Sequence, residues 1–192
     1  MIRTFSLSIF LCIIFSLHSQ RETAYFASGC FWCVEAIFES IDGVIDAQSG
    51  YSGGTTINPT YKQICSGSTG HAETVKVTFR SDKVTYSEML SVFFDSHDPT
   101  TLNRQGPDVG TQYRSAIFCI DERQRILAQQ FVEDLKSQST FKTITTTIET
   151  MTKFYPAEKY HQDFVENNPY HPYVVSVSKP RRLRFLQKFK KP

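Results

Sequence analysis

The stretch Thr23–Ile41 reads TAYFASGCFWCVEAIFESI and predicts a strand followed directly by a helix. Thr23–Ala27 is rich in residues that favour strands, and Ser28-Gly29 separates this run from the next segment. In that segment apolar residues recur at the spacing of one helical face: Phe31, Val34, Ile37 and Phe38. We therefore expect a helix that begins at or near Cys30, with Ser28 available to cap it.

The chain beyond this stretch alternates strands and helices. Further strands are predicted at Gly43–Tyr51, Thr74–Phe79, Gln112–Ile120 and Lys142–Glu149. Further helices are predicted at Ser87–Ser96, Glu122–Ser137 and, as a last short helix, Pro156–Asn167. A loop rich in Gly and Pro, GYSGGTTINPTY, occupies residues 50–61. This order predicts one layered α/β or α+β domain, without a linker between Thr23 and Ser178.

Length and composition indicate one globular domain. The chain has 192 residues, of which 40% are hydrophobic and 21% are charged, and this balance excludes disordered and fibrous classes. Charge is unevenly distributed, because residues 179–191 hold seven of the 21 basic residues and no acid. Residues 20–178 hold 13 basic and 19 acidic residues. An acidic body of this kind argues against nucleic-acid binding, which requires a basic face.

The first 19 residues predict an export signal. Met1–Arg3 supplies a positive start, and Phe5–Leu17 reads FSLSIFLCIIFSL, thirteen residues of which ten are apolar. This run fits the hydrophobic region of a secretory signal and is shorter than the roughly 20 residues of a membrane-spanning helix. We expect cleavage after Ser19 and therefore an exported protein, periplasmic or secreted. An uncleaved signal would instead anchor the chain in the membrane.

Four cysteines follow the signal, which itself contains Cys12: Cys30, Cys33, Cys65 and Cys119. This number is too small for a disulfide scaffold, so the close pair is expected to be catalytic. A thiol at the first turn of a helix lies near unpaired N–H groups that stabilise a thiolate. Cys33 lies on the same helical face, and such a pair can cycle between dithiol and disulfide. Packing as small hydrophobes and a zinc site are the alternatives, although only Cys65 and His71 could complete the latter.

Glu73 is a second candidate for chemistry. It has the parity of the apolar residues Val75, Val77 and Phe79, so a strand that begins at Glu73 directs its carboxyl group toward the core. Burial raises the pKa of a carboxyl group and keeps it protonated near neutral pH, which suits a proton donor. Alternatively, Glu73 precedes the strand and is solvated.

The C-terminal stretch KPRRLRFLQKFKK, residues 179–191, interleaves apolar and basic residues. It could contact a membrane surface or a nucleic acid. We favour a terminal segment that lays its apolar residues on the domain while its charges stay solvated.

Four blocks of sequence resemble peptide methionine sulfoxide reductases of the A class. They are GCFWCVEAIFE, GYSGGTTINPTY, CSGSTGHAE and HDPTTLNRQGPDVGTQYRSAIF, in the order of that family. The resemblance runs from about Tyr25 to Tyr173. It implies an α+β fold, a single-domain two-layer sandwich with a central, mostly antiparallel sheet, packed helices and a ferredoxin-like core. Residues 20–178 would form the catalytic domain, and residues 179–192 a basic C-terminal tail.

The resemblance also implies the activity, which is thiol-dependent reduction of peptide-bound and free methionine (S)-sulfoxide to methionine. Cys30 matches the thiolate that attacks the sulfoxide sulfur, and Glu73 matches the acid that protonates the departing oxygen. The product is methionine plus a sulfenic acid on Cys30. The matched substrate-binding residues are Tyr61 and Tyr113 at the sulfoxide oxygen, Phe31 and Trp32 around the methyl group, and the carboxylate of Asp108.

Resolution of the sulfenic acid departs from the commonest family pattern. Many members have Gly where Cys33 stands and resolve with a cysteine near the C-terminus, whereas no cysteine follows Cys119 here. We therefore expect a Cys30–Cys33 disulfide that a thioredoxin-like reductant reopens. Cys65 is the fallback, and both it and Cys119 are otherwise expected to be structural.

The expected partners are oxidised proteins or peptides and the thioredoxin-like reductant, with no prosthetic cofactor, no metal and no nucleic acid. The chain is expected to be monomeric. Two other classes of protein are alternatives to a sulfoxide reductase. A thioredoxin-like dithiol oxidoreductase would also use CxxC at a helix start, but it usually places Trp before the first Cys. A non-catalytic module that binds oxidised peptides would retain binding without turnover.

Overall fold

The computed structural model describes residues 21–189, and the predicted export signal therefore lies outside the described residues. Within this range the core follows a β-α-β-β-α-β order: β1 Arg21–Ser28, α1 Phe31–Phe38, β2 Val44–Ser52, β3 Ala72–Arg80, α3 Tyr86–Asp95 and β6 Ser115–Cys119. The four strands are arranged as β6-β1-β3-β2, and all neighbours are antiparallel. This is the strand order of a ferredoxin-like core, so the predicted α+β fold class is confirmed.

Two short strands extend the sheet at its edges. β7 Thr147–Thr150 pairs with β6 in parallel, and β8 Tyr155–Pro156 pairs with β2 antiparallel. A separate two-stranded ribbon is formed by β4 Arg104–Gln105 and β5 Asp108–Val109. The sheet of the described residues thus has six strands and is mostly antiparallel.

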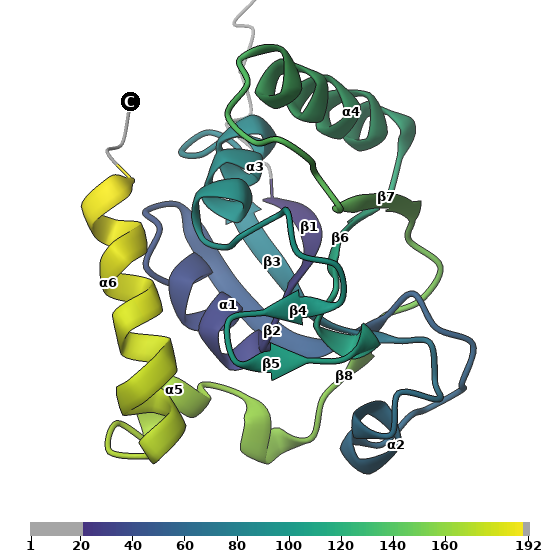
Figure 1. The fold of residues 1–192 in the computed structure, drawn as a ribbon, viewed down its shortest axis with the longest axis vertical. Coiled ribbons are helices and arrows are strands. Elements are labelled where there is room, and N and C mark those ends of the chain that lie inside the picture. The colour runs from purple at the N-terminus through teal and green to yellow at the C-terminus, as the bar shows by residue number, and fades with distance from the viewer. Residues whose placement is uncertain (1–20, 190–192) are drawn as a thin grey trace, which may run out of the picture.

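One face of the sheet carries the main core. Val75, Val77 and Phe79 of β3 belong to the same buried cluster as the apolar residues of α1 and α3, as their alternation predicts. The opposite face holds a smaller cluster: Ala27, Ala72, Ala116 and Phe118. Figure 1 shows α1 beside the sheet, with α6 (Lys179–Lys188) along its outer side.

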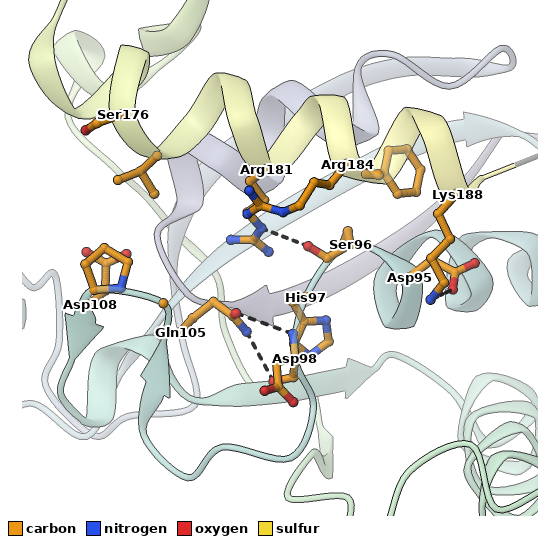
Figure 2. Close-up of a pocket in the computed structure, with 14 residues that line it drawn as sticks. Asp95, Ser96, His97, Asp98, Gln105, Asp108, Ser176, Arg181, Arg184 and Lys188 are labelled. Carbon is orange, nitrogen blue, oxygen red and sulfur yellow. Dashed lines mark hydrogen bonds and ion pairs between the residues drawn. The ribbon is translucent and has the colours of Figure 1, made fainter.

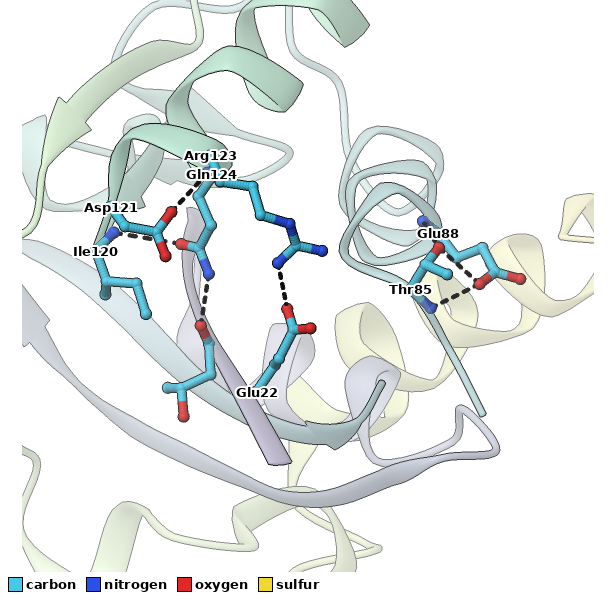
Figure 3. Close-up of polar contacts among 8 residues, drawn as sticks. Glu22, Thr85, Glu88, Ile120, Asp121, Arg123 and Gln124 are labelled. Atoms are coloured by element: carbon cyan, nitrogen blue, oxygen red, sulfur yellow. Dashed lines mark hydrogen bonds and ion pairs between the residues drawn. The ribbon is translucent and has the colours of Figure 1, made fainter. Parts of the chain in front are cut away.

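Capping residues set where α3 (Tyr86–Asp95) and α4 begin, as Figure 3 shows. Thr85 and Glu88 form a reciprocal capping box at the start of α3. α4, Glu122–Ser137, has the predicted bounds, and Asp121 accepts a hydrogen bond of 2.8 Å from the backbone of Gln124. The Gln124 side chain donates to the Thr23 carbonyl at 2.8 Å, which ties this helix to β1.

Three predicted elements differ from the observed ones. The predicted strand Gln112–Ile120 begins only at Ser115, because Thr111–Tyr113 forms a 3-10 turn (η1). The strand predicted at Lys142–Glu149 is confined to β7. The helix predicted at Pro156–Asn167 consists of the end of β8, a 3-10 turn at Lys159–His161 (η2) and α5 Phe164–Asn167. Asp163 adopts a left-handed conformation with φ 53°, which prevents one continuous helix.

A short helix begins at Tyr61, the last residue of the loop rich in Gly and Pro, and continues beyond it. α2, Tyr61–Cys65, begins at a capping box between Thr60 and Gln63. Sequence periodicity does not reveal a helix of five residues, because one turn is too short to repeat an apolar pattern.

The C-terminal segment is part of the folded domain. A π-helical turn, Val174–Ser178 (η3), continues directly into α6, which contacts α1. Phe185 is buried as expected, but Leu183 and Leu186 are exposed and the cation Arg181 is buried. The helical segment thus continues across residue 178, where the basic tail was predicted to begin. No helix within residues 21–189 is long and apolar enough to cross a membrane.

Candidate active site

A pair of thiols lies at the start of α1. Cys30 immediately precedes the helix and is 6% exposed, and Cys33 follows within the first turn and is 1% exposed. The two thiols are hydrogen-bonded to each other, and the Cys33 Sγ donates to Ser178 Oγ at 3.1 Å. Gly29 permits this entry into the helix, because its φ is +88° and a Cβ there would lie 2.5 Å from the Gln105 Cβ.

Negative charge is favoured on Cys33 rather than on Cys30. The nearest helix N–H, that of Phe31, donates to Glu73 Oε2 at 3.0 Å instead of to a sulfur. Burial raises the pKa of Cys30 well above its ordinary value. The hydrogen bond from Cys30 lowers the pKa of Cys33 to about 6, and the Arg181 guanidinium and Ser178 contribute. Burial and the Glu73 charge thus oppose a thiolate at Cys30, and the Phe31 N–H at the helix start is bonded to Glu73.

Glu73 points into the core beside the thiols, as the parity of its strand predicts. It is 1% exposed, and burial raises its pKa to about 8. The hydrogen bond from Phe31 N lowers this pKa, whereas the nearby charges of Asp108 and Cys33 raise it. The carboxyl group is therefore mostly protonated at pH 7 and can donate a proton next to a thiol.

An aromatic cluster lies on the exposed side of α1. The rings of Trp32 and Phe164 are stacked with centroids 3.7 Å apart and an interplanar angle of 7°. Trp32 also donates from Nε1 to His161 Nδ1 at 3.1 Å. Phe31 lies 5.0 Å from the His161 ring and 6.3 Å from the Tyr61 ring, measured between centroids. This arrangement forms an apolar wall in which Phe31, Trp32 and Tyr61 come together.

Polar groups lie next to the thiols and to the aromatic cluster, where the Tyr173 ring packs edge-on against Trp32 with centroids 5.8 Å apart. The Tyr173 hydroxyl donates to Asp108 Oδ2 at 2.5 Å, and its proximity lowers the pKa of both thiols. Burial raises the pKa of Tyr113, and the charges of Glu73 and Asp108 raise it further, which places this phenol near both carboxyl groups. The structure thus brings together all eight site residues predicted from the sequence.

The site is that of a known family. The family model for peptide methionine sulfoxide reductase matches residues 22–192. The chain belongs to this family. A protein of Natronomonas pharaonis named "Peptide methionine sulfoxide reductase MsrA" is 50% identical over 163 residues, which cover 84% of this chain and 92% of that protein. A protein of the same name from Trichodesmium erythraeum is 48% identical over 169 residues, covering 88% and 95%.

Solved structures agree with the family assignment. Reduced Mxr1 from Saccharomyces cerevisiae has a TM-score of 0.74 and 34% identity, and the match covers 79% of this chain and 87% of that one. The predicted family and the predicted class of enzyme, an oxidoreductase of peptide methionine sulfoxide, are confirmed. Members of this family use an external thiol reductant, so a prosthetic group has no part in the mechanism.

Several residues of this reductase site escaped the sequence analysis. Glu158 accepts hydrogen bonds from the Tyr51 hydroxyl at 2.8 Å and from the Tyr61 backbone at 2.9 Å, and so attaches α2 to the site. His161 and Tyr173, described above, were also missed. Their signal was the aromatic-rich stretch from Tyr155 onward, but its apolar spacing predicted a helix and assigned no function to the side chains.

The remaining cysteines lie outside the pair. Cys65 is exposed and hydrogen-bonded to Tyr61, and Cys119 is buried in β6 beside Tyr86. His71, the other candidate zinc ligand, has Nδ1 accepting from the Gly54 backbone at 3.1 Å and Nε2 2.8 Å from the Thr56 carbonyl. Within residues 21–189 no group of three or more His, Cys, Asp or Glu residues is arranged to hold a metal ion.

A cavity of about 590 Å³ flanks the thiol pair between α6 and the segment 95–108. Figure 2 shows Arg181, Arg184 and Lys188 reaching from α6 toward this segment. Asp108 and Arg181 connect the cavity to the thiols, because the first bonds Tyr173 and the second bonds the backbone of Ser28, two residues before Cys30. The cavity therefore adjoins the thiol site through Asp108 and Arg181, and neither cysteine is among its lining residues.

Proposed function

We propose that this reductase acts on the S epimer of methionine sulfoxide in oxidised proteins, with Cys30 as nucleophile and Glu73 as proton donor. One observation carries this proposal: a buried, mostly protonated carboxyl group is hydrogen-bonded to the backbone of the residue that follows Cys30. A thiol with an acid held beside it suits attack at a sulfoxide sulfur coupled to protonation of its oxygen. The preference for the S epimer rests on the resemblance to the A class.

The first step requires a thiolate at Cys30. Transfer of the Cys30 proton to Cys33 within the hydrogen-bonded pair produces it. The Cys30 sulfur then bonds to the sulfoxide sulfur while Glu73 gives its proton to the oxygen. Transfer of the resulting hydroxyl group to Cys30 breaks the S–O bond of the substrate. The products are methionine, the sulfenic acid of Cys30 and the Glu73 carboxylate, so atoms and charge balance.

The aromatic cluster and the phenols provide the substrate site in this proposal. Phe31 and Trp32 hold the methyl group of the substrate against the apolar wall. Tyr61 and Tyr113 donate hydrogen bonds to the sulfoxide oxygen, since burial raises the pKa of both phenols and keeps them protonated. Asp108, fixed by Tyr173, orients the peptide.

The second step forms the Cys30–Cys33 disulfide. The Cys33 sulfur attacks the Cys30 sulfur, the S–O bond of the sulfenic acid breaks, and the hydroxyl group leaves as water with the proton that Cys33 gives up. The position of Cys33 in the first turn of α1, three residues after Cys30, supports it as the resolving residue, because it keeps the two thiols close to each other. A thioredoxin-like dithiol reopens the disulfide by exchange, which is the chemistry such proteins perform on vicinal disulfides.

Export and a monomeric state complete the proposal. The support for export is the apolar run at residues 5–17 after a positive start. The order of the predicted parts, a signal at residues 1–19 before the catalytic domain, favours a periplasmic or extracellular compartment, where methionine oxidation in exposed proteins would supply the substrates of the reductase.

The test uses the purified chain, dithiothreitol and a blocked methionine sulfoxide separated into its two epimers. Chromatography follows the thioether product. We expect consumption of the S epimer by the wild type and none by Cys30→Ser. Turnover of the R epimer would refute the stereochemical assignment. Reduction of insulin disulfides without sulfoxide turnover would instead establish a dithiol oxidoreductase.

A further inference from the structure

The C-terminal helix brings a buried cation to the resolving thiol. The π-helical turn η3 ends at Ser178, whose hydroxyl accepts from Cys33, and Arg181 follows three residues later on the same side of the chain. π-Helical turns inside longer helices are rare and often occur at functional sites. Here the turn orients Ser178 and Arg181 together toward the start of α1.

Arg181 is held in place by backbone carbonyl groups and not by a carboxylate. Its Nε donates to the Ser96 carbonyl at 2.8 Å, and its Nη2 donates to the Ser28 carbonyl at 2.9 Å and lies 3.4 Å from the Ser28 hydroxyl. The residue is 7% exposed. Among residues 21–189, none of the ion pairs involves Arg181.

A buried guanidinium without an ion-pair partner is unusual, because removal of a charge from water is costly unless an opposite charge compensates for it. The carbonyl groups accept hydrogen bonds from Nε and Nη2 but do not cancel the charge of the guanidinium. The thiolate of Cys33 gains from this charge. Besides the Asp108 carboxylate, whose pKa Arg181 also lowers, the Cys33 thiolate is an anion that can compensate for this charge.

We propose that Arg181 is a positioning residue for the resolving step, and that its buried charge holds negative charge on the Cys33 sulfur as this sulfur attacks the Cys30 sulfenic acid. The inference rests on the proposed function and assigns α6 a part in it. In this step Cys33 passes its proton to the Glu73 carboxylate left by the first step, the Cys33–Cys30 bond forms, the S–O bond breaks, and the departing hydroxide takes this proton from Glu73 and leaves as water. Arg181 touches neither substrate nor the departing oxygen and acts through Cys33.

Other ionisable groups also lie close to Cys33 and affect the pKa of its thiol. Cys30 and Tyr173 both lower this pKa. The Glu73 carboxyl group is close enough for the charges of Glu73 and Cys33 to oppose each other. Asp108 faces the thiols through Tyr173. Arg181 is therefore the cation among these neighbours, and its removal should raise the pKa of Cys33.

The expected size of the effect follows from the ionised fraction of Cys33. An opposite charge at this range shifts a pKa by roughly one unit or more. A thiol with a pKa of about 6 is half ionised at pH 6. A rise of about one unit would leave roughly a tenth ionised. In the reduced pair this corresponds to about fivefold less Cys33 thiolate at pH 6 and to little change at pH 8, so we expect Arg181→Met to slow disulfide formation more at pH 6 than at pH 8.

The experiment follows a single turnover of the reduced chain without dithiothreitol. One equivalent of the S epimer is added at pH 6 and at pH 8, and samples are quenched with dimedone and iodoacetamide. Mass spectrometry then resolves the Cys30 sulfenic acid from the disulfide. Arg181→Met should still form one equivalent of methionine, more slowly than the wild type at pH 6 because fewer thiol pairs are ionised, and should accumulate the sulfenic acid at that pH. Arg181→Lys, which keeps the charge, should restore disulfide formation.

Arg184→Met is the matched control, since Arg184 is an exposed arginine one turn away on the same helix. It should behave as the wild type. Alkylation of Cys33 across pH 5–9 in a Cys30→Ser background provides a second measurement, and Arg181→Met should shift its midpoint upward. A purely structural role predicts instead that Arg181→Lys fails like Arg181→Met, or that both rates fall equally at pH 6 and pH 8. Either result refutes the inference, whereas absence of methionine in the wild type refutes the proposed function.

Discussion

Replacement of Glu73 by Gln should inactivate the reductase and stabilise its fold. Burial raises the pKa of Glu73 from 4.5 to about 8, so at pH 7 the folded protein holds a proton that the unfolded chain has released. Each pKa unit corresponds to about 1.4 kcal/mol. Between pH 4.5 and pH 7 the free energy of unfolding of the protein therefore falls by about 3 kcal/mol because of Glu73. Stability due to Glu73 is thus fully present below pH 4.5 and falls as the pH rises toward 8.

The amide introduced by Glu73→Gln would keep an acceptor for the Phe31 N–H without this pH-dependent cost. Urea unfolding should therefore show that the variant gains up to about 3 kcal/mol over the wild type at pH 7 and almost nothing at pH 4.5. Sulfoxide reduction should fall by about 10²–10⁴, the usual worth of a general acid. An equal stability difference at the two pH values would contradict the assigned burial of a protonated carboxyl group.

Glu35→Gln is the matched control for this experiment. Glu35 is also 1% exposed, and burial raises its pKa to about 8 as well. Its carboxyl group accepts from the backbone of Ser49 and Asp163, on the side of α1 away from the thiols. The control should show the same pH-dependent gain in stability and retain sulfoxide reduction. Loss of activity in both variants would show that the activity does not depend specifically on the proton of Glu73.

Three further variants test the site. Cys33→Ser should release one equivalent of methionine and keep dithiothreitol-driven turnover but lose cycling with thioredoxin; unchanged thioredoxin activity would exclude Cys33 as the resolving residue. Tyr173→Phe removes a hydroxyl group that favours both thiolates, so the first turnover should slow about tenfold, as measured by rapid quench. Gly29→Ala places a Cβ 2.5 Å from the Gln105 Cβ at a φ of +88°, and thermal unfolding should show a loss of at least about 1 kcal/mol.

The strand and helix order was predictable because it depends on local periodicity. The α4 bounds were correct, and the parity of Glu73 with Val75 and Val77 placed its carboxyl group on the helix-covered face. Prediction failed where one residue breaks a pattern: Asp163 in a left-handed conformation divides the expected C-terminal helix, and its N–H donates to the buried Glu35 carboxyl group. An apolar spacing carries no information about such a contact.

The sequence by itself determined the core order, the close thiol pair on one helical face and, through resemblance, the family and eight residues of its site. The tertiary structure alone decided the electrostatics of that site. Cys33 meets Ser178 across 145 positions and Trp32 meets His161 across 129. Arg181 reaches the backbone before Cys30 across 153 positions. Such pairs have no local periodicity, and a pKa depends on burial and on every neighbouring charge. The contributions of Ser178 and Arg181 to the Cys33 pKa therefore arise only when the C-terminal segment packs against the start of α1.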